Sequence, residues 1–131
     1  MKIDIDNAPL TYVGDSLIEG KGLFALNGFI KGDIILDYTP FKETFIKTLW
    51  KDLTKYQTNH NWMIPIDDEY CLTSDPVSKI HYVNHSRTPN GDWQIDNMLI
   101  LAAKDILKDE EIFIDYRLEY RPTRIKWPEW I

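Results

Sequence analysis

The stretch that decides the fold lies in the second half of the chain and reads Asn84-His85-Ser86-Arg87-Thr88-Pro89-Asn90. A second stretch follows it, Asp109-Glu110-Glu111-Ile112-Phe113-Ile114-Asp115-Tyr116, and a third precedes it, Glu19-Gly20-Lys21-Gly22-Leu23-Phe24-Ala25. Taken alone, the third stretch is predicted to be a glycine-bearing loop that leads into a short strand. Residues 111–116 are predicted to form the last strand, which is entered through a turn at residues 108–109.

Outward from these stretches, most of the chain is typical of short strands between turns. The predicted strands cover residues 11–13, 23–25, 33–38, 62–66, 70–72, 92–95, 98–103 and 111–116. Pro65 should hold its strand at a sheet edge, because proline cannot donate a ladder hydrogen bond. One amphipathic helix is predicted over residues 41–56, since Phe41, Phe45 and Leu49 recur at helical spacing.

The composition is that of one globular domain of 131 residues, with 44% hydrophobic and 27% charged residues. Its net charge of −6 disfavours nucleic-acid binding and favours encounter with basic partners such as lysine-rich peptides. The chain shows neither a secretory segment nor an apolar run of the ~20 residues that a membrane span needs. We therefore expect a cytosolic protein, or a nuclear one if the source is eukaryotic or viral. The single cysteine, Cys71, excludes an internal disulfide and a multi-cysteine zinc site, so no structural metal is expected.

In this order, the three stretches resemble the motifs of the SET-domain protein lysine methyltransferases. That family shows G-x-G near its start, N-H-S-x-x-P-N in its second half and E-E-[ILV]-x-x-x-Y near its end. The resemblance implies a single SET domain over residues 1–131, with a core at 11–116 and an aromatic tail at 117–131. It implies a mostly β fold of the β-clip type, made of small curved sheets and one main helix. A knot-like crossing of the C-terminal segment is expected to bring Asn84 and His85 beside Tyr116.

The same resemblance implies S-adenosylmethionine as the cofactor. The backbone around Gly22 would meet its methionine part, the Asn84 amide would anchor it, and the main chain of His85 would pair with the adenine edge. His81 stands where family members often carry an arginine that contacts the cofactor carboxylate, and it is retained as a candidate. The candidate cofactor-binding residues are Lys21, Gly22, Leu23, His81, Asn84 and His85.

Tyr116 matches the catalytic tyrosine of the family. Methyl transfer needs a neutral lysine amine, whereas a free lysine, with a pKa of ~10.4, is almost wholly protonated at pH 7. An apolar channel and a neighbouring positive sulfonium both favour loss of that proton, so a tyrosine hydroxyl has only to orient the reacting groups. Trp62 and Ile114 are expected to line the lysine channel. Because some relatives carry an aromatic residue at the position of Ile114, this isoleucine favours room for di- or trimethylation.

The region after Tyr116 departs from many relatives, which close their lysine channel with a cysteine-rich zinc segment. Here the tail contains no cysteine, so its aromatic residues Tyr120, Trp127 and Trp130 are expected to cover the cofactor and the channel. A strap of this kind would shield the adenine ring and the lysine amine from water.

Two other functional classes remain open from the residues alone. A SET-like module that binds the cofactor or a protein without catalysis would fit the departure at His81 and the missing zinc segment. A hydrolase built on Cys71, His85 and Asp92 or Asn90 is compatible with the composition, although Cys71 lies in an apolar run without a nucleophile motif.

The partner implied by the resemblance is a lysine-containing protein or peptide, such as a histone tail, and a homodimer is a further expected assembly. Direct binding of nucleic acid or of a membrane is not expected. No residue pattern identifies the substrate protein or the target lysine.

Overall fold

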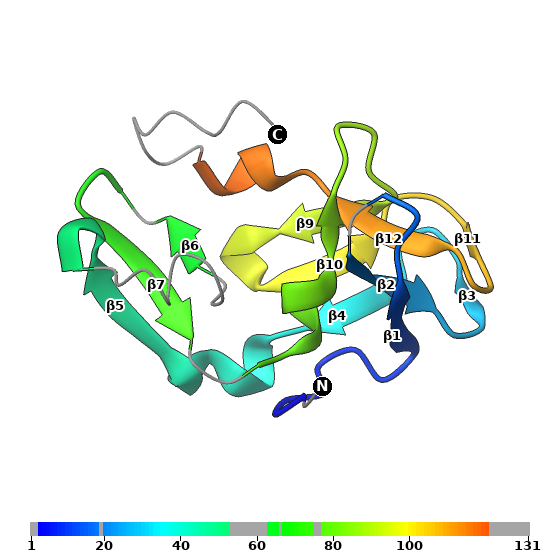
Figure 1. Ribbon diagram of the computed structural model, residues 1–131, viewed down its shortest axis with the longest axis horizontal. Helices are drawn as coiled ribbons and strands as arrows, with labels where there is room; N and C mark the ends of the chain where they lie inside the picture. The colour runs from blue at the N-terminus through cyan, green and yellow to red at the C-terminus, as the bar shows by residue number, and fades with distance from the viewer. Residues whose placement is uncertain (1–2, 19, 53–62, 66, 75–76, 121–131) are drawn as a thin grey trace.

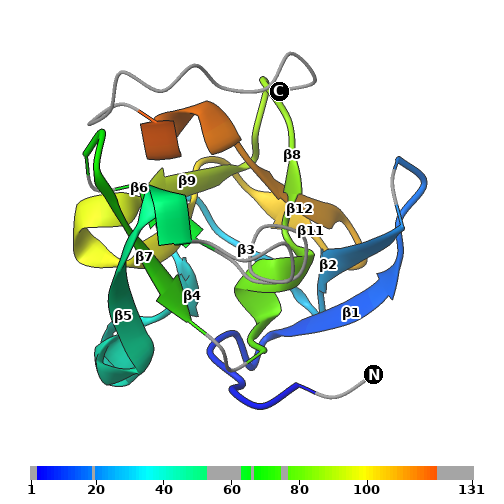
Figure 2. The ribbon, with the colours of Figure 1, turned by 60° about the vertical axis from the view of Figure 1, so that its left-hand side comes forward.

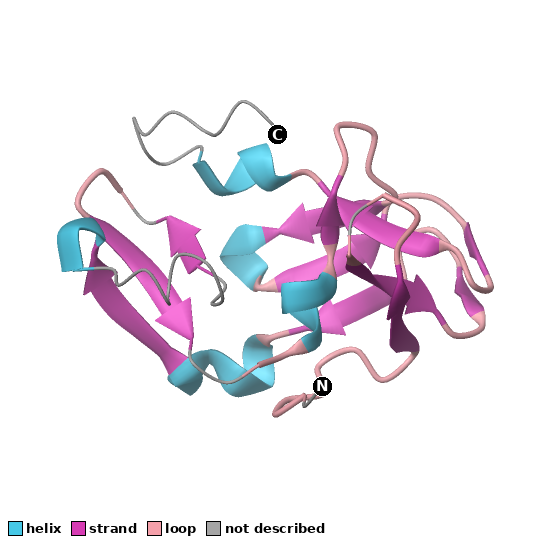
Figure 3. Cartoon of the chain, in the orientation of Figure 1, coloured by secondary structure: helices cyan, strands magenta, loops and turns pink. Residues whose placement is uncertain are grey.

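The computed structural model describes residues 3–18, 20–52, 63–65, 67–74 and 77–120 of the chain (Figure 1). Short strands dominate these residues, and all their helical segments are brief 3-10 turns (Figure 3). The 3-10 turns are η1 (Thr39–Thr44), η2 (Trp50–Asp52), η3 (Lys79–Tyr82), η4 (Ile95–Asn97) and η5 (Tyr116–Tyr120). The prediction of a mostly β fold made of small sheets is therefore confirmed. The knot-like crossing stays a prediction.

The sheet that carries the three motifs has four strands in the order β1-β2-β12-β8 (Figure 2). Its strands are β1 (Thr11–Asp15), β2 (Lys21–Ala25), β12 (Glu111–Ile114) and β8 (Asn84–His85). β12 lies antiparallel to β2 and parallel to β8. The last strand among the described residues is thus inserted between two strands formed by earlier residues.

Two smaller sheets pack beside this one. One has the order β4-β10-β9, from β4 (Ile34–Asp37), β10 (Leu99–Ala102) and β9 (Gly91–Gln94), and the other joins β11 (Ile106–Leu107) to β3 (Gly28–Phe29). Side chains alternate along β12, so that Ile112 and Ile114 are buried while Glu111 and Phe113 are half-buried. Burying each such isoleucine contributes roughly 1.5–3 kcal/mol to stability, which ties β12 to the core. The core cluster is made of Ala8, Leu23, Ala25, Phe29, Ile35, Leu36, Tyr38, Ile80, Val83, Trp93, Ile100, Ala102, Ile106, Ile112 and Ile114.

The fourth sheet stands apart at the left of Figure 1 and has the order β5-β7-β6. It is built from β5 (Phe45–Leu49), β7 (Tyr70–Ser74) and β6 (Met63–Pro65). Pro65 lies on an edge strand, as predicted. The turn before β7 is closed by Asp67, whose Oδ1 accepts the backbone N–H groups of Glu69 at 2.8 Å and Tyr70 at 2.7 Å.

The predicted helix over residues 41–56 is wrong for its described part. Residues 45–49 form β5 and pair with β7 throughout, and the chain before them bends at Phe41, with φ −118° and ψ 15°. Phe41 and Phe45 do share a neighbour, because their rings lie 6.2 Å and 4.7 Å from that of Tyr38. The helical spacing therefore arises from a 3-10 turn and a strand that approach one buried tyrosine. Ile46 and Thr48, both β-branched, favour the strand.

Some predictions fall outside the described residues. These are the end of the predicted helix at 53–56, Trp62, and the tail from residue 121 with Trp127 and Trp130. Among the residues that the structure does describe, no helix has the length and apolar character needed to cross a membrane.

Candidate functional site

The three motifs converge on β12. Its register sets Ile112 opposite Leu23 of β2, and Phe113 and Ile114 opposite Asn84 and His85 of β8. The backbone N–H of Ser86 extends this pairing with a 3.0 Å hydrogen bond to the Ile114 carbonyl. The predicted meeting of Asn84 and His85 with the segment that ends in Tyr116 is therefore confirmed.

Asn90, the last letter of the N-H-S-x-x-P-N motif, fastens the loop after β8 to β12. Its side chain is buried and donates from Nδ2 to the Glu111 carbonyl at 2.8 Å, while its Oδ1 accepts the Phe113 N–H at 2.9 Å. The next residue must be glycine, because a Cβ on Gly91 would lie 2.9 Å from the Phe113 carbonyl oxygen. From the sequence alone, Asn90 has a role only in the hydrolase alternative, and the N-H-S-x-x-P-N motif is the signal for the role found here.

Asn84 joins β8 to the G-x-G stretch. Its Nδ2 donates to the Lys21 carbonyl at 3.0 Å and to Oε2 of Glu111 at 2.9 Å. The other Glu111 oxygen accepts the Ser16 hydroxyl at 2.7 Å. Glu111 was not predicted as a site residue, although it is the second glutamate of the E-E motif.

Gly22 lies directly against the Glu111 side chain, which would have to move if residue 22 carried a side chain. A Cβ at this position would lie 2.4 Å from Oε2 of Glu111, so the glutamate carboxylate occupies the space that the glycine leaves. The Lys21 side chain is half-exposed and pairs with Asp15, whose pKa it lowers by donating a hydrogen bond to the carboxylate. Leu23, in contrast, is fully buried in the core. Lys21 and Gly22 thus lie beside Asn84 and Glu111, whereas Leu23 contributes its side chain to the core, and the roles of all three toward the cofactor stay predictions.

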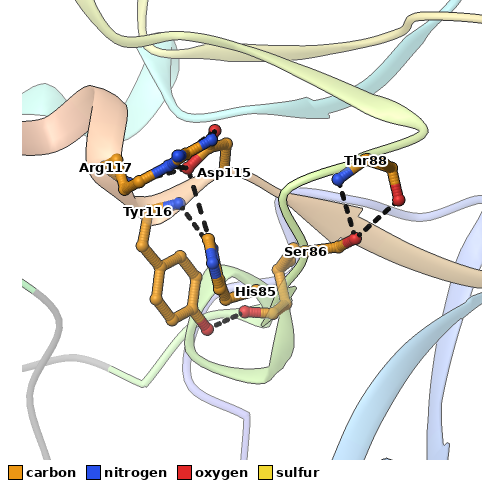
Figure 4. Close-up of polar contacts among 7 residues, drawn as sticks. His85, Ser86, Thr88, Asp115, Tyr116 and Arg117 are labelled. Atoms are coloured by element: carbon orange, nitrogen blue, oxygen red, sulfur yellow. Dashed lines mark hydrogen bonds and ion pairs between the residues drawn. The ribbon is translucent and has the colours of Figure 1, made fainter. Parts of the chain in front are cut away.

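Tyr116 lies directly beside β8 (Figure 4). Its hydroxyl donates to the Val83 carbonyl, and its backbone N–H donates to Nδ1 of His85 at 3.0 Å. The centroids of the Tyr116 and His85 rings are 5.1 Å apart. Because Nδ1 accepts a hydrogen, the proton of the neutral His85 ring resides on Nε2.

Charges behind this pair hold the backbone bend after β12. The Arg117 guanidinium donates two hydrogen bonds to the Asp115 carboxylate, from Nε to Oδ1 at 2.9 Å and from Nη2 to Oδ2 at 2.6 Å. This bonding lowers the pKa of Asp115. Desolvation lowers the pKa of His85. The Asp115 carboxylate, whose Oδ1 is 3.8 Å from Nδ1 of His85, acts in the opposite direction but is the smaller effect. His85 is therefore kept neutral near pH 7, the state in which Nδ1 can accept the Tyr116 N–H.

Two further candidate residues are partly or fully buried, His81 and Ile114. His81, in η3, accepts the Ser78 N–H at its Nδ1 at 3.1 Å, and burial lowers its pKa. Ile114 is 1% exposed and belongs to the core cluster. Their assigned roles toward the cofactor carboxylate and the lysine channel stay predictions, as does that of Trp62, which lies outside the described residues.

The model of the SET domain family matches residues 20–117. The chain is 30% identical over 125 residues to histone-lysine N-methyltransferase TRX1 of Oryza sativa subsp. japonica, covering 86% of this chain and 12% of that protein. It is 25% identical over 128 residues to histone-lysine N-methyltransferase 2D of Homo sapiens, covering 89% of this chain and 2% of that protein. The chain thus spans only a small part of these relatives.

A solved structure shares the fold. It is that of a Plasmodium falciparum protein described as a candidate histone methyltransferase, and it superposes with a TM-score of 0.56 at 23% identity, covering 92% of this chain and 96% of that one. The family model spans most of the chain and includes all three motifs that meet at β12. The chain accordingly belongs to the SET domain family.

Proposed function

We propose that the chain is an S-adenosylmethionine-dependent protein lysine N-methyltransferase, whose substrate is a lysine of a basic protein such as a histone tail. The observation that carries the proposal is the convergence of Asn84, the Gly22 main chain and Tyr116 on the single strand β12. Support for the substrate class comes from the net charge of −6 and from relatives named as histone-lysine methyltransferases.

The residues beside the G-x-G stretch fit the proposed cofactor. Ser16, Asn84 and Glu111 form a connected polar cluster that carries one carboxylate, next to the main chain of Lys21. A negative cluster suits a ligand that carries an α-ammonium group and a sulfonium. When bound, S-adenosylmethionine would supply an activated methyl group on positive sulfur.

Tyr116 would act by orientation. Its hydroxyl donates to the Val83 carbonyl, so the phenolic oxygen is presented as an acceptor in a fixed direction. An acceptor at that place can orient a neutral amine or contact a methyl hydrogen through a weak CH···O interaction. His85 supports this geometry by holding the Tyr116 N–H, so no side chain needs to serve as a strong base.

Binding of S-adenosylmethionine, measured by calorimetry, tests the cofactor directly. Asn84→Ala should weaken binding more than tenfold, because hydrogen bonds that involve charged groups commonly contribute ~1.5–3 kcal/mol. Asn97→Ala, which changes an exposed asparagine in η4, is the matched control and should bind as the unmodified chain does. An unchanged affinity in folded Asn84→Ala would contradict the cofactor assignment.

Methyl transfer is tested with labelled S-adenosylmethionine, histones and a lysate of the source organism, followed by mass spectrometry of the labelled bands. Label on lysine supports the enzyme. Cofactor binding without label on any protein favours the alternative, a catalytically weak SET-like binding module. The cytosolic or nuclear location and the homodimer stay predictions.

A further inference from the structure

Glu111 connects three separate segments of the site through one carboxylate. Oε1 accepts the hydroxyl of Ser16, in the loop after β1, and Oε2 accepts the amide of Asn84, in β8. Oε2 also fills the space above Gly22 of β2. The side chain lies on β12, the strand that separates β2 from β8, so it can reach both neighbours at once.

The contacts of Asn84 determine which way its side-chain amide points. The amide has two donor hydrogens at one end and a carbonyl acceptor at the other. Two groups that contact its Nδ2, the Lys21 carbonyl and the Glu111 carboxylate, can only accept hydrogens. They therefore hold the NH₂ end, and the amide oxygen must point the other way. Loss of the carboxylate would remove the charged one of these two acceptors.

We propose that Glu111 is a positioning residue of the cofactor site, which orients the Asn84 amide and fixes the loop after β1 against it. This inference rests on the proposed function, because the affinity that Glu111 supports is that for S-adenosylmethionine. Glu111 acts through Asn84 and Ser16, so its loss should weaken cofactor binding while leaving the chemical step at Tyr116 nearly unchanged.

The neighbouring Glu110 provides a matched control within the same motif. It is exposed, and its Oε2 accepts the backbone N–H of Leu107 at 3.2 Å, in the turn before β12. Glu110→Ala removes the same charge and the same side-chain volume one residue away from the site. A general effect of net charge or of the E-E motif would appear equally in both variants.

The experiment is a double-mutant cycle on cofactor affinity, measured by calorimetry. Glu111→Ala should weaken S-adenosylmethionine binding about tenfold, and Glu110→Ala should change it by less than about twofold. Combining Glu111→Ala with Asn84→Ala should add almost nothing to the loss caused by Asn84→Ala alone, because the two groups act as one unit. A merely structural role of Glu111 would give additive losses.

Glu111→Gln keeps the test decisive if the alanine variant does not fold. The glutamine amide can still accept from Asn84 with its oxygen and donate to the Ser16 hydroxyl with its nitrogen, so it should retain more affinity than alanine. In turnover assays, the KM for S-adenosylmethionine should rise in Glu111→Gln while kcat stays within about twofold.

The outcomes separate this inference from the proposed function. If the unmodified chain does not bind S-adenosylmethionine, the proposed function is wrong and the role of Glu111 is wrong with it. If the unmodified chain binds and the Glu111 variants bind equally well, or if the losses are additive, only the Glu111 inference is overturned. A fall in kcat with unchanged KM would also overturn it.

Discussion

The motif sheet β1-β2-β12-β8 and the outer sheet β5-β7-β6 are held together in different ways. In the motif sheet, side chains donate to the backbone of distant segments, as Asn84 does to Lys21 and Asn90 does to Glu111. In the outer sheet, the ladder is reinforced by contacts between its own strands, such as that of the half-buried Thr48 hydroxyl with the buried Thr73 hydroxyl at 3.1 Å. A substitution in the motif sheet therefore disturbs several segments at once, whereas one in the outer sheet should remain local.

The sharpest test of this difference replaces one tyrosine in each sheet region. Tyr116→Phe should lower turnover by roughly 100-fold or more, the size of effect seen when a preorganised polar group at a reacting centre is removed. Cofactor affinity should stay within a few fold, since the hydroxyl acts during methyl transfer.

Tyr70→Phe is the matched change in the outer sheet, where the Tyr70 ring lies 4.3 Å from the Lys47 ammonium. It should leave turnover within about twofold, because that contact uses the ring face and not the hydroxyl. Steady-state kinetics on the substrate found by labelling measures both variants. Similar turnover in Tyr116→Phe and Tyr70→Phe would remove the catalytic assignment.

The next largest effect is expected for stability at Asn90. Asn90→Ala leaves the Glu111 carbonyl and the Phe113 N–H without their side-chain partner in a buried place, at a cost of about 2–3 kcal/mol in the free energy of unfolding. Urea denaturation followed by tryptophan fluorescence measures this cost. A loss below about 1 kcal/mol would show that the loop after β8 holds to β12 without this side chain.

Acid should weaken the region of the motif sheet through two half-buried histidines, His85 of β8 and His81 of η3. Burial lowers the pKa of both His81 and His85 below the unfolded value of ~6.5, so the unfolded chain binds more protons than the folded one below that pH. Stability is then highest above about pH 6.5 and falls as the pH drops toward the folded pKa values. The slope from each histidine cannot exceed about 1.4 kcal/mol per pH unit.

Urea midpoints between pH 8 and pH 5 check this expectation. His85→Asn should flatten the slope, because the asparagine oxygen can accept the Tyr116 N–H at any pH. Asp115 contributes in a separate window, since its lowered pKa gives stability that is present above about pH 4 and is lost in stronger acid. Constant or rising stability from pH 7 to pH 5 would rule out the histidine contribution.

The smallest effect is expected in the outer sheet. Thr48→Val removes the hydroxyl contact with Thr73 but keeps a β-branched residue suited to β5. The free energy of unfolding should change by less than about 0.5 kcal/mol, as for a partly exposed contact. A loss as large as that of Asn90→Ala would mean that the two sheets do not differ in the way described.

The sequence predicted best where residue type and chemistry are closely linked. The strands around the motifs and the edge position of Pro65 follow from the identity of particular residues. The approach of Asn84 and His85 to Tyr116 is implied by the resemblance to the SET-domain family. The helix over 41–56 failed because its evidence was spacing alone. Two rings four residues apart can meet a common neighbour, here Tyr38, from a bent chain as well as from a helix.

Other features could not be predicted because they leave no periodic signal. β3, β8 and β11 have two residues each, which is too short for any alternation to be seen. The roles of Asn90 and Glu111 depend on the side chains that reach them from other strands, and those distances exist only after folding. Both residues belong to the sequence motifs, but only the contacts in the folded structure show which segments each side chain connects.

The place of β12 between β2 and β8 has a consequence for how the protein folds during synthesis. A strand formed by residues 111–114 must be inserted between β2 and β8, which leave the ribosome earlier. Until then, neither β2 nor β8 can form its hydrogen bonds with β12. Such nonlocal pairing is slow, and it leaves the edges of β2 and β8 exposed meanwhile. Until that insertion, Glu111, Asn84 and Ser16 remain on separate pieces of chain. Binding of the proposed cofactor would therefore report on completed folding, and a nascent chain released before β12 would lack the candidate site and expose two unpaired strand edges.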